Sequence, residues 1–166
     1  YSANEYFNDN NLADIRVTSQ IAFTDSDIDK IKELDSVAEV AVSHYTDVFV
    51  TVGENLIPDS DGSDLVCRVN SLDIAEAQNF YKNGTVSSDY VNRLNLKSGR
   101  YPEKANECLV DSAAAEKYEA LSLGRKIMLT GDGETVSSEI KNTEFTVVGT
   151  VYSPMYISSD RGQTDI

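Results

Sequence analysis

One stretch, Gly99–Tyr118, constrains the fold of this chain more than any other segment. Gly99 and Pro102 are typical of a turn. The short apolar run Cys108–Val110 predicts a brief strand. Asp111 directly precedes a run of small residues that favour helix, and an aspartate in that place is a common helix N-cap. The stretch therefore predicts a turn, a strand and a helix in immediate succession.

Other strands are predicted where apolar residues alternate with polar ones or form a short run. These stretches are Ala13–Val17, Val40–Val52, Leu65–Asn70, Ile127–Leu129 and Phe145–Val151. Because Val40–Val52 is longer than a typical strand, we expect a bend or bulge near His44–Thr46. Leu65–Asn70 should return antiparallel to it after the turn-rich loop 53–64, and Pro154 should end the last strand.

Two helices are predicted besides the one that follows Asp111. Thr24 is an expected N-cap, because Asp27 stands three residues later, where a capping box places an acidic side chain. Residues at helical spacing form the apolar stripe of this helix: Ile28, Ile31 and Leu34. A shorter helix is expected over Asp73–Tyr81, and a tight turn over residues 131–133.

This order of elements predicts an α+β fold, in which the strands are accompanied by a few short helices. Strand, helix and strand in succession over residues 13–52 make a βαβ unit, whose crossover is right-handed if the strands are parallel. We expect a mixed-sheet domain of two lobes, a βαβ lobe over residues 12–81 and a β-rich lobe over residues 97–152. A length of 166 residues fits one domain of this kind.

The chain is strongly acidic, with a formal net charge of −14. Such a surface repels phosphate backbones and anionic lipid headgroups, which argues against nucleic-acid binding. We interpret the acidity as a source of solubility, since the sequence shows no localised acidic groove for a cationic partner. It contains no run of about 18 apolar residues and no signal peptide. The chain opens at Tyr1 rather than Met, as expected of an excised fragment or a processed product.

Cys67 and Cys108 are too few for a disulfide scaffold. Both stand in apolar strand patterns, which favours two buried free thiols. A bridge between them is the alternative in a protein located outside the cytosol. The sequence leaves this choice open.

No residue is predicted to be catalytic, cofactor-binding or metal-binding. His44 is the only histidine, and its alternation with valines favours an ordinary strand side chain over a catalytic base. Ser138–Lys141 matches the Ser-x-x-Lys pattern of penicillin-recognising enzymes, but the accompanying Lys-Thr-Gly element is missing. Gly131-x-Gly133 lacks the third glycine of a dinucleotide fingerprint. The sequon Asn83–Thr85 would matter only in a eukaryotic secretory route.

The loop that contains Asp59, Asp61 and Asp64 has the acidity of a calcium site without its spacing. In an EF-hand, glycine stands at position six and glutamate at position twelve, whereas here Gly62 is fourth and Asn70 is twelfth. We interpret the segment as a solvated acidic hairpin loop, with weak calcium binding as the alternative. A zinc site would need four Cys or His ligands at close spacing.

Several of these stretches together resemble one family. Ser98–Pro102 followed by Glu107–Asp111 resembles its S-G-R-x-P…E-x-V-V/L-D pattern, and Phe145–Val151 resembles its F-x-V-V-G-x-V strand. Further matches, in the same order along the chain, are Asn11–Val17, Val37–Val40, Leu123–Leu129, Ser153–Ile157 and Arg161–Gly162. The ordered set is similar to the extracytoplasmic domain of FtsX-like ABC-transporter permeases, the MacB-type periplasmic core domain, including its longer Gram-positive members.

The resemblance implies a non-catalytic extracellular domain of a permease in the cell membrane. Such a domain couples cytoplasmic ATP hydrolysis to export or handling of a peptide, lipoprotein or partner protein outside the membrane. The implied partners are a cytoplasmic ATP-binding subunit, flanking transmembrane helices and a second permease copy, with no cofactor. Lobe 12–81 would be Porter-like and lobe 97–152 Sabre-like, with the polar segment 82–98 as a hinge or an ordinary surface loop. Because family domains continue into a further lobe, the single domain 1–166 is expected to be truncated.

Two other interpretations stay open on the residues alone. One is a free-standing secreted binding or adhesion module with a similar α+β core. The other is a small hydrolase that uses His44 with a serine or a carboxylate in a concave pocket. Neither the cargo nor the direction of transport follows from the sequence.

Overall fold

The computed structural model describes residues 2–19, 21–83, 90–131 and 140–155. Its helices are α1 (Ala3–Asp9), α2 (Asp25–Lys32), α3 (Ile74–Asn83), α4 (Ser112–Lys117) and the 3-10 helix η1 (Glu119–Leu121). Its strands are β1 (Tyr45–Val52), β2 (Asn55–Leu56), β3 (Val66–Asn70), β4 (Asn95–Gly99), β5 (Glu107–Asp111), β6 (Lys126–Thr130) and β7 (Glu144–Tyr152). None of the helices in these ranges has the length and hydropathy needed to cross a bilayer.

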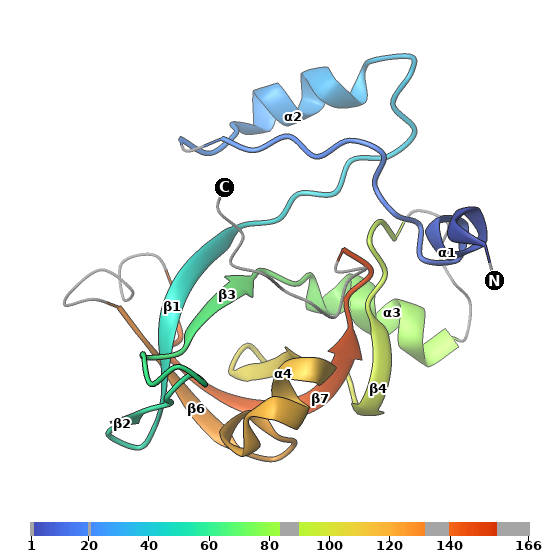
Figure 1. The fold of residues 1–166 in the computed structure, drawn as a ribbon. Coiled ribbons are helices and arrows are strands. Elements are labelled where there is room, and N and C mark those ends of the chain that lie inside the picture. The colour runs from blue at the N-terminus through green and yellow to red at the C-terminus, as the bar shows by residue number, and fades with distance from the viewer. Residues whose placement is uncertain (1, 20, 84–89, 132–139, 156–166) are drawn as a thin grey trace.

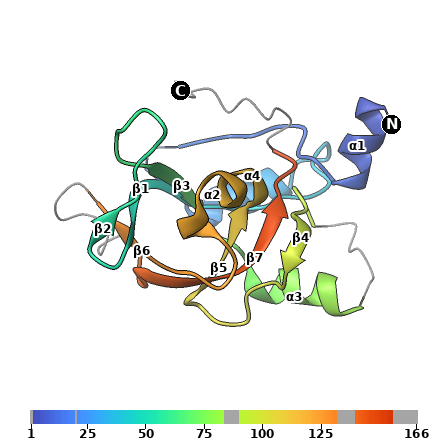
Figure 2. The same cartoon turned by 60° about the horizontal axis from the view of Figure 1, so that its bottom comes forward.

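The seven strands form one mixed sheet. Its main path runs β2-β1-β6-β7-β4, with β3 paired to β1 and β5 paired to β7. The β5–β7 pairing is parallel, and the others are antiparallel. In Figure 1 the strands curve around α4, and Figure 2 shows the same arrangement from another side. The predicted α+β class and mixed sheet are therefore confirmed.

One hydrophobic core joins both halves of the chain. Its buried members are Val48, Val50, Ile57, Leu65, Leu121, Ile127, Leu129 and Val147. Strand β1 pairs with β6 in the register Val50↔Leu129, so the ranges 12–81 and 97–152 contribute to one sheet. The division into two lobes stays a prediction.

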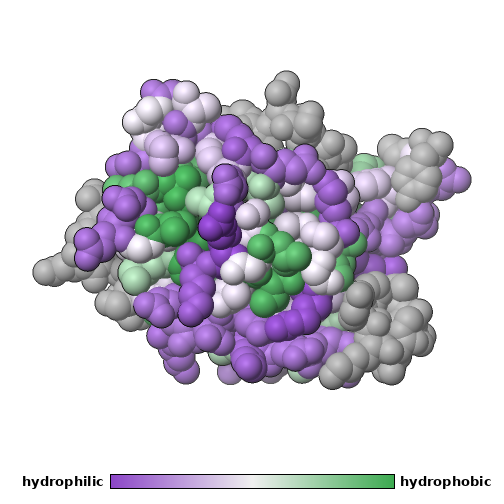
Figure 3. Space-filling model, turned by 90° about the horizontal axis from the view of Figure 1, so that it is seen from below, coloured by the Kyte–Doolittle hydropathy of each residue, from purple (hydrophilic) through white to green (hydrophobic). Residues whose placement is uncertain are grey.

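Seen from below, polar residues separate the apolar patches of the surface (Figure 3).

Most of the elements predicted from local pattern are present. Strands β3, β5, β6 and β7 and helix α3 lie within a few residues of the expected positions. The Asp111 carboxylate accepts a hydrogen bond from the Ala113 amide at 3.0 Å and caps α4, as predicted. Strand β7 ends at Tyr152, two residues before Pro154.

The strand predicted over Ala13–Val17 is wrong. These residues form no strand, and their apolar side chains face solvent, with Ile15 80% and Val17 63% exposed. An alternating pattern forms a strand only where a neighbouring strand supplies hydrogen bonds to its backbone. No described strand pairs with Ala13–Val17. The expected βαβ unit therefore lacks its first strand, and its crossover does not arise.

The long strand predicted over Val40–Val52 is shorter than expected. It begins at Tyr45, within the stretch where we expected a bend, and residues 40–44 have no regular structure. Its start coincides with the end of its neighbour, because Tyr45 pairs with Asn70, the last residue of β3. The length of the partner strand thus decides where β1 begins.

Helix α2 has the predicted capping box but little packing. The Thr24 hydroxyl accepts from the Asp27 amide at 3.3 Å, and the Asp27 carboxylate accepts from the Thr24 amide at 3.1 Å. However, no residue of α2 is buried, and Leu34 is 54% exposed. Figure 1 shows α2 apart from the sheet, beside the extended segment that precedes it. We call the described residues 14–19 and 21–43 the arm.

Some predictions fall on residues outside the described ranges. These are most of the turn 131–133, Ser138 and Glu139 of the Ser-x-x-Lys match, Gly84 and Thr85 of the sequon, and the tail 158–166. Of the hinge candidate 82–98, residues 84–89 lie outside them and residues 95–98 belong to β4.

Candidate functional site

An ion pair holds the turn between β4 and β5. The Arg100 guanidinium donates two hydrogen bonds to the Glu107 carboxylate, at 2.7 and 2.6 Å. The Glu103 amide donates to the same carboxylate at 2.8 Å. These donors, Arg100 first, lower the pKa of Glu107 to about 2. The residues of the turn motif therefore bind one another.

Two glycines bring the turn against β7. Gly99 on β4 lies opposite Gly149 on β7, and the Arg100 amide donates to the Val148 carbonyl at 2.9 Å. A β-carbon on Gly99 would stand 2.2 Å from the Val148 carbonyl oxygen. The backbone of Gly99 also has a φ of +78°, a conformation that glycine adopts readily. The two sequence patterns that carry the family resemblance thus meet in space as a packing contact.

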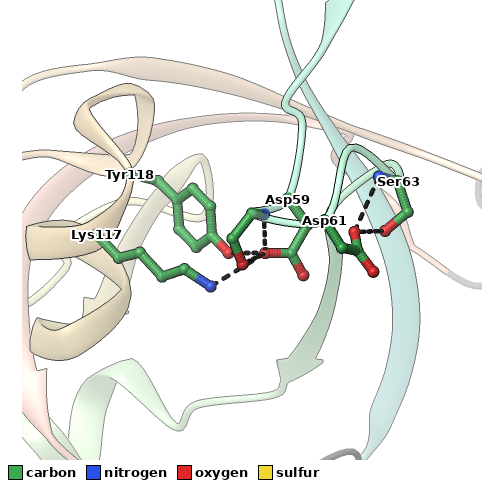
Figure 4. Close-up of polar contacts among 6 residues, drawn as sticks. Asp59, Asp61, Ser63, Lys117 and Tyr118 are labelled. Atoms are coloured by element: carbon green, nitrogen blue, oxygen red, sulfur yellow. Dashed lines mark hydrogen bonds and ion pairs between the residues drawn. The ribbon is translucent and has the colours of Figure 1, made fainter.

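A second polar cluster links the acidic loop, residues 58–64, to the end of α4 (Figure 4). One oxygen of the Asp59 carboxylate accepts from the Lys117 ammonium at 3.0 Å and from the Tyr118 hydroxyl. The same oxygen accepts from the Ser60 amide at 2.5 Å. We call Asp59, Lys117 and Tyr118 the clasp, because they connect the 12–81 range to the 97–152 range.

The clasp stabilises the charged form of Asp59. The Tyr118 hydroxyl, the Ser60 amide and the Lys117 ammonium together hold the pKa of Asp59 well below its ordinary range. Desolvation, followed by the hydrogen bond to Asp59, raises the pKa of Tyr118. The Lys117 ammonium also lies 4.8 Å from the centre of the Tyr118 ring, within cation–π range. Asp59 is therefore ionised and Tyr118 neutral at neutral pH.

The other acids of this loop do not converge with Asp59 on a common centre. Asp61 accepts from the amide and hydroxyl of Ser63, at 2.9 and 2.6 Å (Figure 4). Among the residues that the structure describes, no three His, Cys, Asp or Glu side chains are grouped so that they could hold a metal ion. The loop is thus organised by hydrogen bonds within itself and to α4.

We expect Asp59→Asn to lower the melting temperature by a few degrees at pH 7, because it removes the charge that the clasp stabilises. The folded-state pKa lies below the ordinary value of 3.8, so the stabilisation is complete above about pH 4 and is lost as the pH falls further. The difference between wild type and variant should therefore shrink below pH 4. Thermal unfolding from pH 7 to pH 3 measures it.

Asp64→Asn is the matched control, because it changes the same charge in the same loop at an exposed position. If both variants lose equal stability, or if the Asp59→Asn deficit is independent of pH, the clasp does not stabilise the fold.

Among the residues that the structure describes, His44 has no partners of the kind that catalysis requires. It is exposed and stands directly before β1. Its backbone amide donates to the Ser71 hydroxyl at 2.9 Å, and its carbonyl accepts from the Ser71 amide at 2.8 Å. A general base needs an acid that orients its ring, and the described residues give His44 no side-chain hydrogen bond of that kind. The hydrolase interpretation thus gains no support.

The two cysteines are free and half-buried. Both pack against the core cluster. Burial raises the pKa of Cys67 to about 11 and that of Cys108 to about 12. Of the two alternatives that the sequence left open, the structure contains the free thiols, and both are protonated at neutral pH.

Sequence analysis missed both polar clusters. The Arg100–Glu107 pair had a local signal, because opposite charges flank a short turn with glycine and proline. The clasp had no local signal in the sequence, because Asp59 and Tyr118 are far apart in the chain and meet only after the sheet forms.

Comparison with known proteins adds two findings. The family model of the MacB-like periplasmic core domain matches residues 2–165. Among solved structures, the chain is similar to the extracellular domain of the noncanonic ABC-type transporter YknZ from Gram-positive bacteria. The sequence identity is 17% and the TM-score is 0.45, over 81% of this chain and 60% of that one. The chain thus spans less than two thirds of that structure. No curated protein matches the sequence significantly.

Proposed function

This chain belongs to the family of MacB-like periplasmic core domains, and from that membership we propose that it is the extracellular domain of an ABC transporter permease. The observation that carries the proposal is the family match, which extends over residues 2–165. In this role the domain lies on the outer side of the cell membrane, attached to transmembrane helices of the same permease.

The proposed mechanism is mechanical. ATP is hydrolysed on a separate cytoplasmic subunit, and the domain couples that step to the export or handling of a peptide, a lipoprotein or a partner protein. A relay needs a body that moves without bending. The shared core of both chain halves and the clasp between the acidic loop and α4 support such a body.

A role without catalysis fits the way in which the motif residues are used. Arg100 and Glu107 neutralise each other, and Asp111 caps a helix. Gly99 and Gly149 allow two backbones to approach. Each of these residues has a structural partner that accounts for its place in the pattern.

The second candidate is a free-standing secreted binding or adhesion module. The observation that favours it is the arm, on which several large apolar side chains are exposed: Ile15, Val17, Ile21, Leu34 and Val42. Exposed apolar patches often mark surfaces that bind a partner. The same surface is compatible with a permease domain that contacts its cargo or another part of the transporter.

Labelling of intact cells tests whether the domain lies outside the cytoplasm, and cell fractionation then separates the two candidates. A cysteine at the exposed position Glu33, in the product of the complete gene, should react with a membrane-impermeant maleimide on intact cells. Cys67 and Cys108 should contribute little background, because their raised pKa values suppress the thiolate. The parent protein without the new cysteine is the control.

The permease proposal also expects the product in the membrane fraction, together with a co-purifying ATP-binding subunit. Recovery of the product from the culture medium, free of membranes, would overturn it and favour the secreted module. Labelling only after the cells are permeabilised would contradict both candidates.

A further inference from the structure

Four asparagines connect the end of α1 to the segment that leads into β4. The Asn92 amide donates to the Asn11 carbonyl at 2.8 Å. The next residue, Arg93, donates its amide to the Asn10 carbonyl at 3.0 Å. The Asn95 side chain also contributes. We call Asn10, Asn11, Asn92 and Asn95 the asparagine junction.

The side chains of the junction extend this pairing on both sides. The Asn10 side chain donates to the Tyr6 carbonyl within α1 at 2.7 Å and accepts from the Asn95 amide group at the start of β4. The Asn92 side chain accepts from the Ala13 amide at 3.0 Å. Asn10 is 5% exposed, so the two bonds of its side chain are partly shielded from water, whereas the bond between Asn92 and Ala13 is exposed. One buried side chain thus joins a helix to a strand.

The backbone at the junction explains why asparagine occurs there. Asn11 and Asn92 have φ values of 46° and 55°, in the left-handed region. After glycine, asparagine is among the residues that tolerate this conformation best. Unlike glycine, it also supplies the acceptor that Asn92 presents to Ala13.

The junction is attached to the packed body of the protein. Tyr90 and Tyr101 are 6% and 3% exposed, and the Tyr101 hydroxyl donates to the Leu94 carbonyl. Asn95 pairs with Tyr152, the last residue of β7. The end of α1 and the end of β7 therefore meet at the start of β4.

The arm is held differently. Within it, the Arg16 guanidinium lies 5.5 Å from the centre of the exposed Tyr45 ring. Directly after its far end, the backbone amide of His44 donates to the Ser71 hydroxyl at 2.9 Å. Helix α2 between these points has no buried residue. Few buried contacts allow a segment to move without disturbing the core.

From these contacts we propose that the asparagine junction joins α1 and the sheet into one rigid body, while the arm moves independently of both. A displacement applied at α1 is then delivered to β4 and β7. The use of this displacement in transport rests on the proposed function, whereas the rigid connection between α1 and the sheet does not.

Distances between spin labels test the proposal on the 166-residue chain, with Cys67 and Cys108 replaced by alanine. One label pair, at the exposed positions Asn4 and Lys126, reports α1 against the sheet. A second pair, at Asp29 and Lys126, reports the arm against the sheet. We expect a narrow distance distribution for the first pair and one at least twice as wide for the second.

The combined variant Asn10→Ala and Asn95→Ala should widen the α1–sheet distribution about twofold. Asn95→Ala alone, which retains the hydrogen bond from the Asn10 side chain to the Tyr6 carbonyl, should widen it less. Asn8→Ala is the matched control, because Asn8 is an exposed asparagine of the same helix. Circular dichroism and melting temperature establish that each variant is folded.

An unchanged distribution in the folded combined variant would overturn the proposal, as would a wild-type α1–sheet distribution as wide as that of the arm. A product that is not labelled on intact cells, or that is recovered from the culture medium free of membranes, would refute the permease role and leave the rigid connection standing. The two proposals can therefore fail separately.

Discussion

Gly99→Ala should lower the free energy of unfolding by about 3 kcal/mol, the combined cost of a left-handed backbone and an overpacked contact. The φ of Gly99 is +78°. A β-carbon there would stand 2.2 Å from the Val148 carbonyl oxygen and 2.8 Å from the α-carbon of Gly149. Both atoms belong to backbone in the middle of β7, which cannot move aside without disturbing its pairings. Urea denaturation monitored by circular dichroism measures the loss.

Gly53→Ala separates the two contributions. Gly53 has a similar φ of +62°, but a β-carbon there would meet no heavy atom within 4 Å. This control should lose only about 1 kcal/mol, the cost of the backbone conformation. Equal losses for the two variants would show that the close approach of β4 to β7 does not constrain position 99.

Leu129→Ala should lower the free energy of unfolding by about 3 kcal/mol, within the range that buried leucines lose when they are truncated. Leu129 is 4% exposed and belongs to the central core cluster. It lies on β6, which is paired to β1 on one side and β7 on the other. A cavity at this position therefore affects both halves of the chain. The same urea denaturation experiment applies.

Leu34→Ala is the matched control in the arm. Leu34 is 54% exposed, so the same truncation should change stability by less than about 0.5 kcal/mol. A loss comparable to that of Leu129→Ala would mean that the arm packs tightly against the body. It would also contradict the independent arm in the further inference.

The motif residues connect these predictions to the family. Gly99, Arg100, Glu107 and Asp111 make the pattern recognisable in the sequence, and each has a structural partner in the fold. We expect such a pattern in a domain whose role depends on keeping its shape. This is a further reason to propose a mechanical role.

The sequence alone determined the elements whose causes are local. The Asp111 cap, the capping box at Thr24 and the alternation that produces β6 and β7 each depend on residues a few positions apart. Cap hydrogen bonds and side-chain periodicity act at that range. The same local patterns identified the α+β class and the family resemblance.

Only the tertiary structure decided which of these local patterns pair with a neighbouring strand or pack against another element. The alternation at Ala13–Val17 equals that of a strand, yet none of the described strands pairs with it, and its side chains remain exposed. The clasp and the asparagine junction join residues that are distant in the chain. The parallel pairing of β5 with β7 likewise joins separate segments. Such contacts form only after the chain has closed long loops, so no local pattern encodes them.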